Sequence, residues 1–113
     1  MTISEFSLKV DAPIDTIRYY EKIGLIKPNR NKYQREYQQN DVEIFLAIRK
    51  LAKAGIKLSD IKIILNMEEA DIKNGRLLNL LISCKEVILE TEKEIQLAKQ
   101  MLDKMIEKVK GEN

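Results

Sequence analysis

A stripe of apolar and small residues runs unbroken along the last third of the chain, and it restricts this part to one long helix. From residue 77 to residue 109 these residues recur at alternating spacings of four and three, and no Pro or Gly interrupts them before Gly111. Read as heptads, the stripe has Leu81, Ile88, Ile95, Leu102 and Val109 at its a positions, and Leu77, Cys84, Thr91, Ala98 and Met105 at its d positions. This pattern predicts a coiled-coil helix roughly 50 Å long.

A helix of this length needs a partner, because the rest of the chain is too small to cover its stripe. The simplest partner is a second copy of the chain. The small residues Thr91 and Ala98 would allow close approach near the middle of the helix. The expected dimer contacts are Leu81, Ile88, Thr91, Ile95, Ala98 and Leu102. The alternative is a helix that folds back on its own head.

Residues 14–25 place an Arg beside two Tyr on a short helix, which Pro13 opens and Gly24 ends with a left-handed cap. Ile14 and Ile17 share the face towards a core, whereas Arg18 and Tyr19 lie on another face. A guanidinium beside a phenol suits a sugar-phosphate backbone. The alternative is that the two Tyr are packing residues and the Arg is a solvated charge.

The surroundings favour a DNA-binding head. Thr2 or Ser4 can cap a first helix that runs to about Val10, and the turn at residues 11–12 completes a helix-turn-helix. Residues 25–29 and 34–37 are expected to form a small β-hairpin, a wing with four basic residues against one acid. The alternative is a solvated basic loop.

Two further helices and a linker complete the expected organisation. Asn40 or Asp41 starts a third helix that Gly55 ends, and a fourth covers residues 58–66. The fourth helix is expected to turn Leu58, Ile61, Ile64 and Leu65 inward. The fold class is therefore mainly α, a winged helix-turn-helix head with a long C-terminal coiled-coil helix. The expected domains are a DNA-binding domain at residues 1–70, a linker at 71–76 and a dimerisation helix at 77–110.

Charge supports this division. Residues 1–66 carry 12 Lys and Arg against 8 Asp and Glu, whereas residues 67–113 carry 8 against 10. A basic head on an acidic helical stem fits a nucleic-acid-binding protein with a protein-interaction stem.

Several classes are excluded by residues that the sequence lacks. With one cysteine, Cys84, and no histidine, the chain cannot form an internal disulfide, complete a soft-metal site alone or use a His base. It has no clustered nucleophile and base and no Gly-rich phosphate loop, so an enzyme is not expected, and neither is a cofactor. No signal peptide and no membrane-spanning run is evident, which predicts a cytoplasmic protein.

Four stretches of the head occur in an order and spacing that chance explains poorly: residues 2–6 (Thr-Ile-Ser-Glu-Phe), 16–28 (Thr-Ile-Arg-Tyr-Tyr-Glu-Lys-Ile-Gly-Leu-Ile-Lys-Pro), 35–37 (Arg-Glu-Tyr) and 51–56 (Leu-Ala-Lys-Ala-Gly-Ile). They resemble the MerR family of bacterial transcription regulators, and the stem resembles that family by type and length. The resemblance implies a homodimer built on antiparallel stem helices, with the second head helix in the major groove. It also implies promoters with an overlong spacer, which the dimer distorts so that RNA polymerase holoenzyme can use them.

The candidate DNA-binding residues are Thr16, Arg18, Tyr19, Lys32, Arg35, Tyr37, Arg49 and Lys50. The resemblance implies that the first three contact DNA from the second helix, and that Arg35 and Tyr37 do so from the wing. Lys32 adds a basic residue to the wing, and Arg49 and Lys50 are basic positions of the third helix.

The chain departs from the family pattern at three informative positions. Asp11 stands where the family usually has Gly, but Asp tolerates the left-handed geometry of the turn. Asp15 lies in the expected recognition helix, where it repels phosphate but can accept a hydrogen bond from cytosine N4. Lys57 stands where a capping Ser or Thr is usual, so Ser59 is expected to cap a shortened fourth helix.

The signal remains open among three possibilities: a small ligand between head and stem, a redox or electrophile response of Cys84, or no ligand. A single Cys at a d position is more often a small core residue than a sensor. Two rival functions differ in class. An architectural DNA-bending or excision factor of a mobile element would not need the long stem, and a pure coiled-coil interaction module would not need Arg18 and Tyr19 beside a basic wing.

Overall fold

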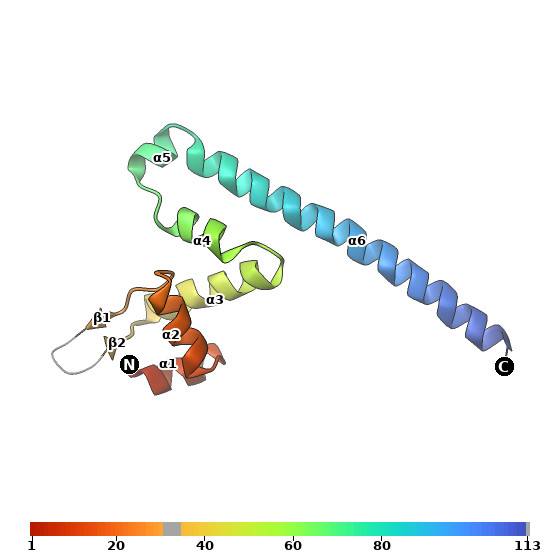
Figure 1. Cartoon of the computed structure of the whole chain (residues 1–113), viewed down its shortest axis with the longest axis horizontal. Helices are drawn as coiled ribbons and strands as arrows, with labels where there is room; N and C mark the ends of the chain where they lie inside the picture. Colours follow the sequence, from red (N-terminus) through yellow and green to blue (C-terminus); the bar gives the residue numbers. More distant parts are fainter. Residues whose placement is uncertain (31–34, 113) are drawn as a thin grey trace.

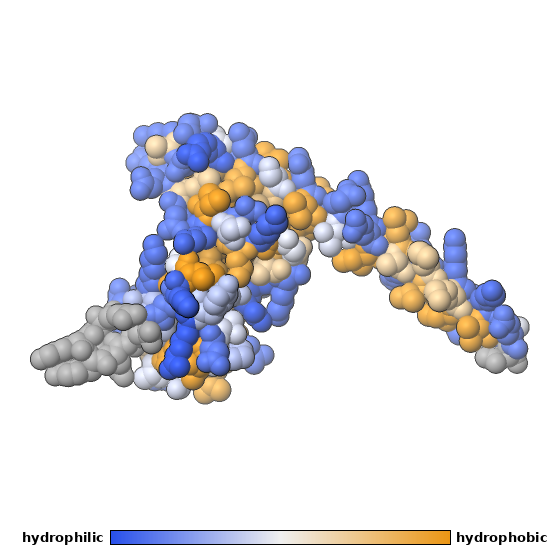
Figure 2. All heavy atoms as spheres, in the orientation of Figure 1, coloured by the Kyte–Doolittle hydropathy of each residue, from blue (hydrophilic) through white to orange (hydrophobic). Residues whose placement is uncertain are grey.

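The computed structural model describes residues 1–30 and 35–112, and in this part the chain forms a small helical head from which one long helix projects (Figure 1). Its principal extents are 68 × 40 × 19 Å. In chain order the elements are α1 (Ile3–Val10), α2 (Ile14–Lys22), β1 (Asn29–Arg30), β2 (Arg35–Glu36), α3 (Gln39–Lys53), α4 (Leu58–Leu65), α5 (Glu69–Lys73) and α6 (Arg76–Glu112). Figure 2 shows apolar side chains continuing along α6 beyond the head. None of the described helices is both long and apolar enough to cross a membrane.

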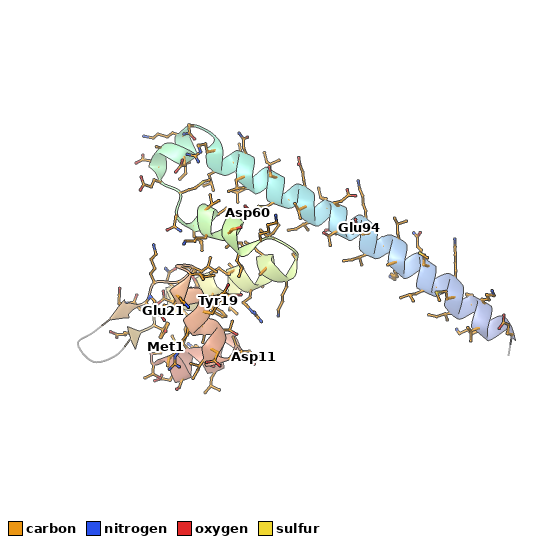
Figure 3. All side chains as sticks on the ribbon, in the orientation of Figure 1. Met1, Asp11, Tyr19, Glu21, Asp60 and Glu94 are labelled. Atoms are coloured by element: carbon orange, nitrogen blue, oxygen red, sulfur yellow. The ribbon has the colours of Figure 1, made fainter. Side chains whose placement is uncertain are left out.

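The helix-turn-helix is built by local capping. Thr2, and not Ser4, caps α1: its hydroxyl accepts from the amide of Glu5 at 3.2 Å, and the Glu5 carboxylate accepts from the Thr2 amide. Asp11 ends α1 in the left-handed region, at φ 52°, as the sequence predicts (Figure 3). Pro13 takes the N-cap of α2, and Gly24 follows that helix at φ +82°. The turn at residues 11–13 therefore sets the direction of α2 relative to α1, and Gly24 ends α2.

The expected wing is reduced to a ladder of two residues on each strand. β1 and β2 pair antiparallel, with Asn29 opposite Glu36. The strands were predicted at residues 25–29 and 34–37, which is longer than the observed ladder. Leu25 and Ile26 do not pair in it, and their side chains are buried in the core. Burial of their side chains competes with extension of the hairpin.

An aromatic cluster holds the head together. The ring of Phe6 stacks on Tyr37 with a centroid distance of 4.5 Å and meets Phe45 edge-on at 5.6 Å. Tyr20 of α2 lies 5.2 Å from Phe45 of α3. Each such pair contributes about 0.5–1.5 kcal/mol beyond simple burial. The cluster therefore fixes α2 and the base of the strand ladder on α1 and α3.

Two expectations for α4 are wrong. Its N-cap is Lys57, whose side chain makes no cap hydrogen bond, and Ser59 lies inside the first turn. Leu65, expected to face inward, is 42% exposed at the C-terminal end of the helix. Ile61 is buried as predicted, because it faces both the head core and α6.

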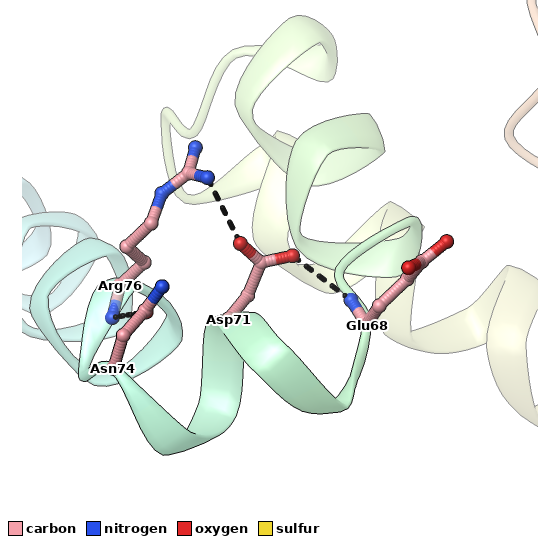
Figure 4. Close-up of polar contacts among 4 residues, drawn as sticks. All are labelled: Glu68, Asp71, Asn74 and Arg76. Atoms are coloured by element: carbon pink, nitrogen blue, oxygen red, sulfur yellow. Dashed lines mark hydrogen bonds and ion pairs between the residues drawn. The ribbon is translucent and has the colours of Figure 1, made fainter.

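The segment expected as a linker contains a short helix, α5. The Asp71 carboxylate accepts from the backbone amide of Glu68 at 3.0 Å and pairs with the Arg76 guanidinium at 2.9 Å (Figure 4). The Asn74 side chain accepts from the Arg76 amide, which starts α6. Ion pairs near the surface add little stability, so the capping hydrogen bonds are the main local support of this turn.

Helix α6 has 37 residues and is continuous through Gly111. Near its start it packs on its own head, where Cys84 is buried and Leu80 and Ile88 contact the core. Farther along, Ile95 and Leu102 are 62% and 59% exposed. The stripe is therefore partly covered by the head over its first turns, where Leu81 stays 45% exposed, and uncovered over the rest.

Candidate nucleic-acid interface

The exposed side of α2 carries four polar side chains at positions that follow one another along one helix face. Asp15, Arg18, Tyr19 and Lys22 are all exposed, at spacings of three, one and three. Ile17, at 0% exposure, points the opposite way. Arg18 and Tyr19 are therefore on a different face of α2 from Ile17, as expected; Figure 3 labels Tyr19 on this helix. The face offers a cation and a phenol to a ligand as a continuous strip.

The two tyrosines of α2 have different surroundings. Tyr20 is 4% exposed and packs on Phe45, whereas Tyr19 is 52% exposed. The alternative that both are packing residues therefore holds for Tyr20 alone. Thr16 is half-buried beside the exposed face, in the first turn of α2.

Tyr37 corrects the sequence prediction. It is 1% exposed, and its hydroxyl donates to the Glu21 carboxylate at 3.2 Å. Its backbone carbonyl accepts from the N-terminal ammonium of Met1 at 2.6 Å. The family resemblance implies that Tyr37 contacts DNA from the wing together with Arg35, but β2 ends at Glu36 and the side chain of Tyr37 is buried before α3 begins. Tyr37 is therefore a packing residue at the base of the ladder.

Glu21 is a positioning residue that the sequence reasoning did not single out. It lies on α2 and accepts from Tyr37, so it links the helix that carries Arg18 to the base of the strand ladder. The available signal was its place directly after the buried Tyr20, on a half-buried side of the helix.

The other candidates lie on separate elements. Arg35 is in β2, and Lys32 lies outside the described residues. Arg49 is half-buried and Lys50 exposed, both towards the C-terminal end of α3. Among the described residues, no contact joins Arg49 or Lys50 to the strip on α2.

The predicted dimer residues fall into two groups. Leu81, Ile95, Ala98 and Leu102 are exposed on α6. Ile88 is half-buried against the core of its own head, so part of its side chain is already covered in a single copy. Thr91 is also half-buried, and its hydroxyl donates to the carbonyl of Val87 at 3.0 Å.

Cys84 lies at the joint between head and stem and not in an open seam. It lines a cavity of about 210 Å³ together with Ile56 and Lys57 before α4, Asp60 of α4 and Leu80 of α6. Burial, and to a smaller extent the Asp60 carboxylate, raises the pKa of its thiol. A raised pKa leaves less of the nucleophilic thiolate at neutral pH. The position therefore favours the core role over the sensor role. The part of the chain that the structure describes contains no cluster of three or more His, Cys, Asp or Glu able to hold a metal ion.

Comparison with known proteins identifies relatives of the whole chain. Residues 1–68 match the family described as MerR HTH family regulatory protein. The HTH-type transcriptional regulator YyaN of Bacillus subtilis (strain 168) is 29% identical over 118 residues, which cover 97% of this chain and 86% of the relative. A crystal structure of a MerR family transcriptional regulator from Listeria monocytogenes superposes with a TM-score of 0.84 at 28% identity, covering 94% of this chain and 83% of that one.

A second similar structure contains DNA. HiNmlR, described as a MerR family regulator lacking the sensor domain and bound to promoter DNA, superposes with a TM-score of 0.68 at 24% identity. The match covers 91% of this chain and 78% of that chain. At this identity the likeness is one of fold.

Proposed function

This chain belongs to the MerR family of helix-turn-helix transcriptional regulators, which bind DNA, and we propose that it acts as a homodimer that distorts promoter DNA with an overlong spacer. In this proposal α2 enters the major groove, α6 pairs antiparallel with the α6 of a second copy, and RNA polymerase holoenzyme uses the distorted promoter. The protein acts in the cytoplasm and needs no cofactor for binding.

The observation that carries the DNA-binding part is the strip on α2. Arg18 and Lys22 are exposed beside Tyr19, and no described acid or carbonyl pairs with either cation. Charge-assisted contacts to phosphate need cations that are not already paired with an acid of the protein. The likeness of the fold to that of HiNmlR, whose crystal structure contains promoter DNA, agrees with this use of the head.

The dimer part rests on the uncovered length of α6. Ile95, Leu102 and Val109 are each about three-fifths exposed on one stripe, where water contacts apolar surface. Two antiparallel helices would cover both stripes and hold two heads at a fixed separation. A fixed separation allows the dimer to bend a duplex whose polymerase-contact elements are misaligned by the overlong spacer, at a deformation cost that the extra contacts offset. A DNA-bending factor that did not dimerise would leave this stripe unexplained.

Removing either proposed phosphate contact should weaken DNA binding. We expect Arg18→Ala and Arg35→Ala each to cost about 1–3 kcal/mol and to reduce the salt slope of binding by about 1. Fluorescence anisotropy with a promoter duplex, across a salt series, measures both quantities. Lys93→Ala is the matched control, because it removes one positive charge from an exposed position of α6 outside the a and d positions. If both head variants bind like the control, α2 and β2 do not contact DNA as proposed.

The spacer makes a separate prediction. Shortening the spacer of the target promoter to the usual length should yield transcription that no longer depends on the regulator, because the polymerase-contact elements are then already aligned. In vitro transcription with and without the protein, from both templates, measures this. Equal dependence on the regulator at both lengths would refute the distortion mechanism while leaving DNA binding intact.

A further inference from the structure

One acid lies on the exposed strip of α2, and its position is unusual for a surface that faces DNA. Asp15 is in the first turn of the helix, three residues before Arg18 and four before Tyr19, and all three are exposed. Its carboxylate has no hydrogen-bond or ion-pair partner among the described residues. The strip is otherwise made of cations and a phenol.

In a major groove, the carboxylate needs a specific donor. Phosphates repel it, and the N-terminal residues of a recognition helix are those that approach the base edges. Two base donors face the major groove, N4 of cytosine and N6 of adenine. Adenine also presents the N7 acceptor beside its donor, which opposes a second acceptor. Cytosine is therefore the base that matches Asp15.

A structural explanation predicts something different. Carboxylates in the first turn of a helix interact favourably with the helix dipole, whatever the helix binds. Asp60 occupies the first turn of α4 in the same way, on a helix that the proposed function does not place against DNA. If the dipole alone accounts for Asp15, its replacement should change no base preference.

We propose that Asp15 selects a cytosine at one position in each half-site of the operator. This inference rests on the proposed function, since it assumes that α2 enters the major groove. It makes Asp15 a determinant of which promoter is bound, whereas Arg18 and Arg35 determine how tightly DNA is held in general.

Selection from a randomised duplex library tests the proposal. The wild-type protein should enrich a cytosine at one position in each half-site, with a preference over other bases on the order of 10-fold. Asp15→Asn should shift that position towards adenine, because an amide pairs with both N6 and N7 of adenine. Asp60→Asn, the matched control, should leave the selected sequence unchanged.

The outcomes distinguish a failure of DNA binding from a failure of the assignment of Asp15. If the wild-type protein selects no duplex at all, the proposed function fails. If it selects a sequence that Asp15→Asn selects equally, or if Asp60→Asn causes the same shift, the assignment of Asp15 is overturned while DNA binding stands. A shift confined to Asp15→Asn and to a single symmetric position supports it.

Discussion

Replacing Ile95 and Leu102 together with Asp is expected to convert the protein from a dimer to a monomer. Both side chains are exposed in one copy, at 62% and 59%, and both lie at a positions of the stripe. In an antiparallel pair they would be enclosed, and an unpaired carboxylate in a dry seam costs several kcal/mol. Each dimer would contain four such carboxylates, two from each chain. Sedimentation equilibrium at micromolar concentration distinguishes the two states.

Leu97→Asp is the matched control for this experiment. Leu97 is 61% exposed on the same helix but lies outside the a and d positions, so its replacement should leave the dimer intact. Ile88 is unsuitable, because it packs on its own head and a charge there would also disturb the joint. A wild-type protein that sediments as a monomer, or a control that dissociates as fully as the double variant, would contradict the proposed dimer.

The long helix and the helix-turn-helix could be predicted because their signals are local or strongly periodic. The caps at Thr2, Asp11 and Gly24 depend on neighbours a few residues away, and the stripe of α6 repeats over more than four heptads. A heptad pattern does not show which other surface covers the apolar stripe. Cys84 and a seam residue such as Ile95 look equivalent in the repeat, but the position of α4 buries only the first.

Predictions failed where long-range packing opposed a weak local pattern. The resemblance placed Tyr37 with Arg35 on the wing, yet the stack of its ring on Phe6, 31 residues earlier in the chain, decides its orientation. The linker expected at residues 71–76 overlaps the short helix α5, in which Asp71 accepts from a backbone amide and pairs with a guanidinium. Such contacts become visible only once the elements are placed in space.

Truncating Tyr37 should unfold much of the head. We expect Tyr37→Ala to lower the free energy of unfolding by about 3–5 kcal/mol, because it removes the ring that packs on Phe6 and leaves a cavity. That is a large part of the roughly 5–15 kcal/mol typical of small domains. Tyr37→Phe keeps the ring and loses only the hydrogen bond to Glu21, at a cost of about 1–2 kcal/mol. Urea unfolding followed by circular dichroism measures both variants.

Tyr19, on α2, is expected to behave in the opposite way to Tyr37. It is 52% exposed, so Tyr19→Ala should change unfolding by less than about 1 kcal/mol while weakening DNA binding. Measuring stability and duplex affinity for Tyr19→Ala, Tyr37→Ala and Tyr37→Phe separates a packing role from a DNA contact. If Tyr37→Phe retained full stability yet lost affinity as Tyr19→Ala does, its hydroxyl would be reaching DNA and its assignment to the core would be wrong. A stable Tyr37→Ala variant would count against the aromatic cluster as the element that fixes α2 on the head.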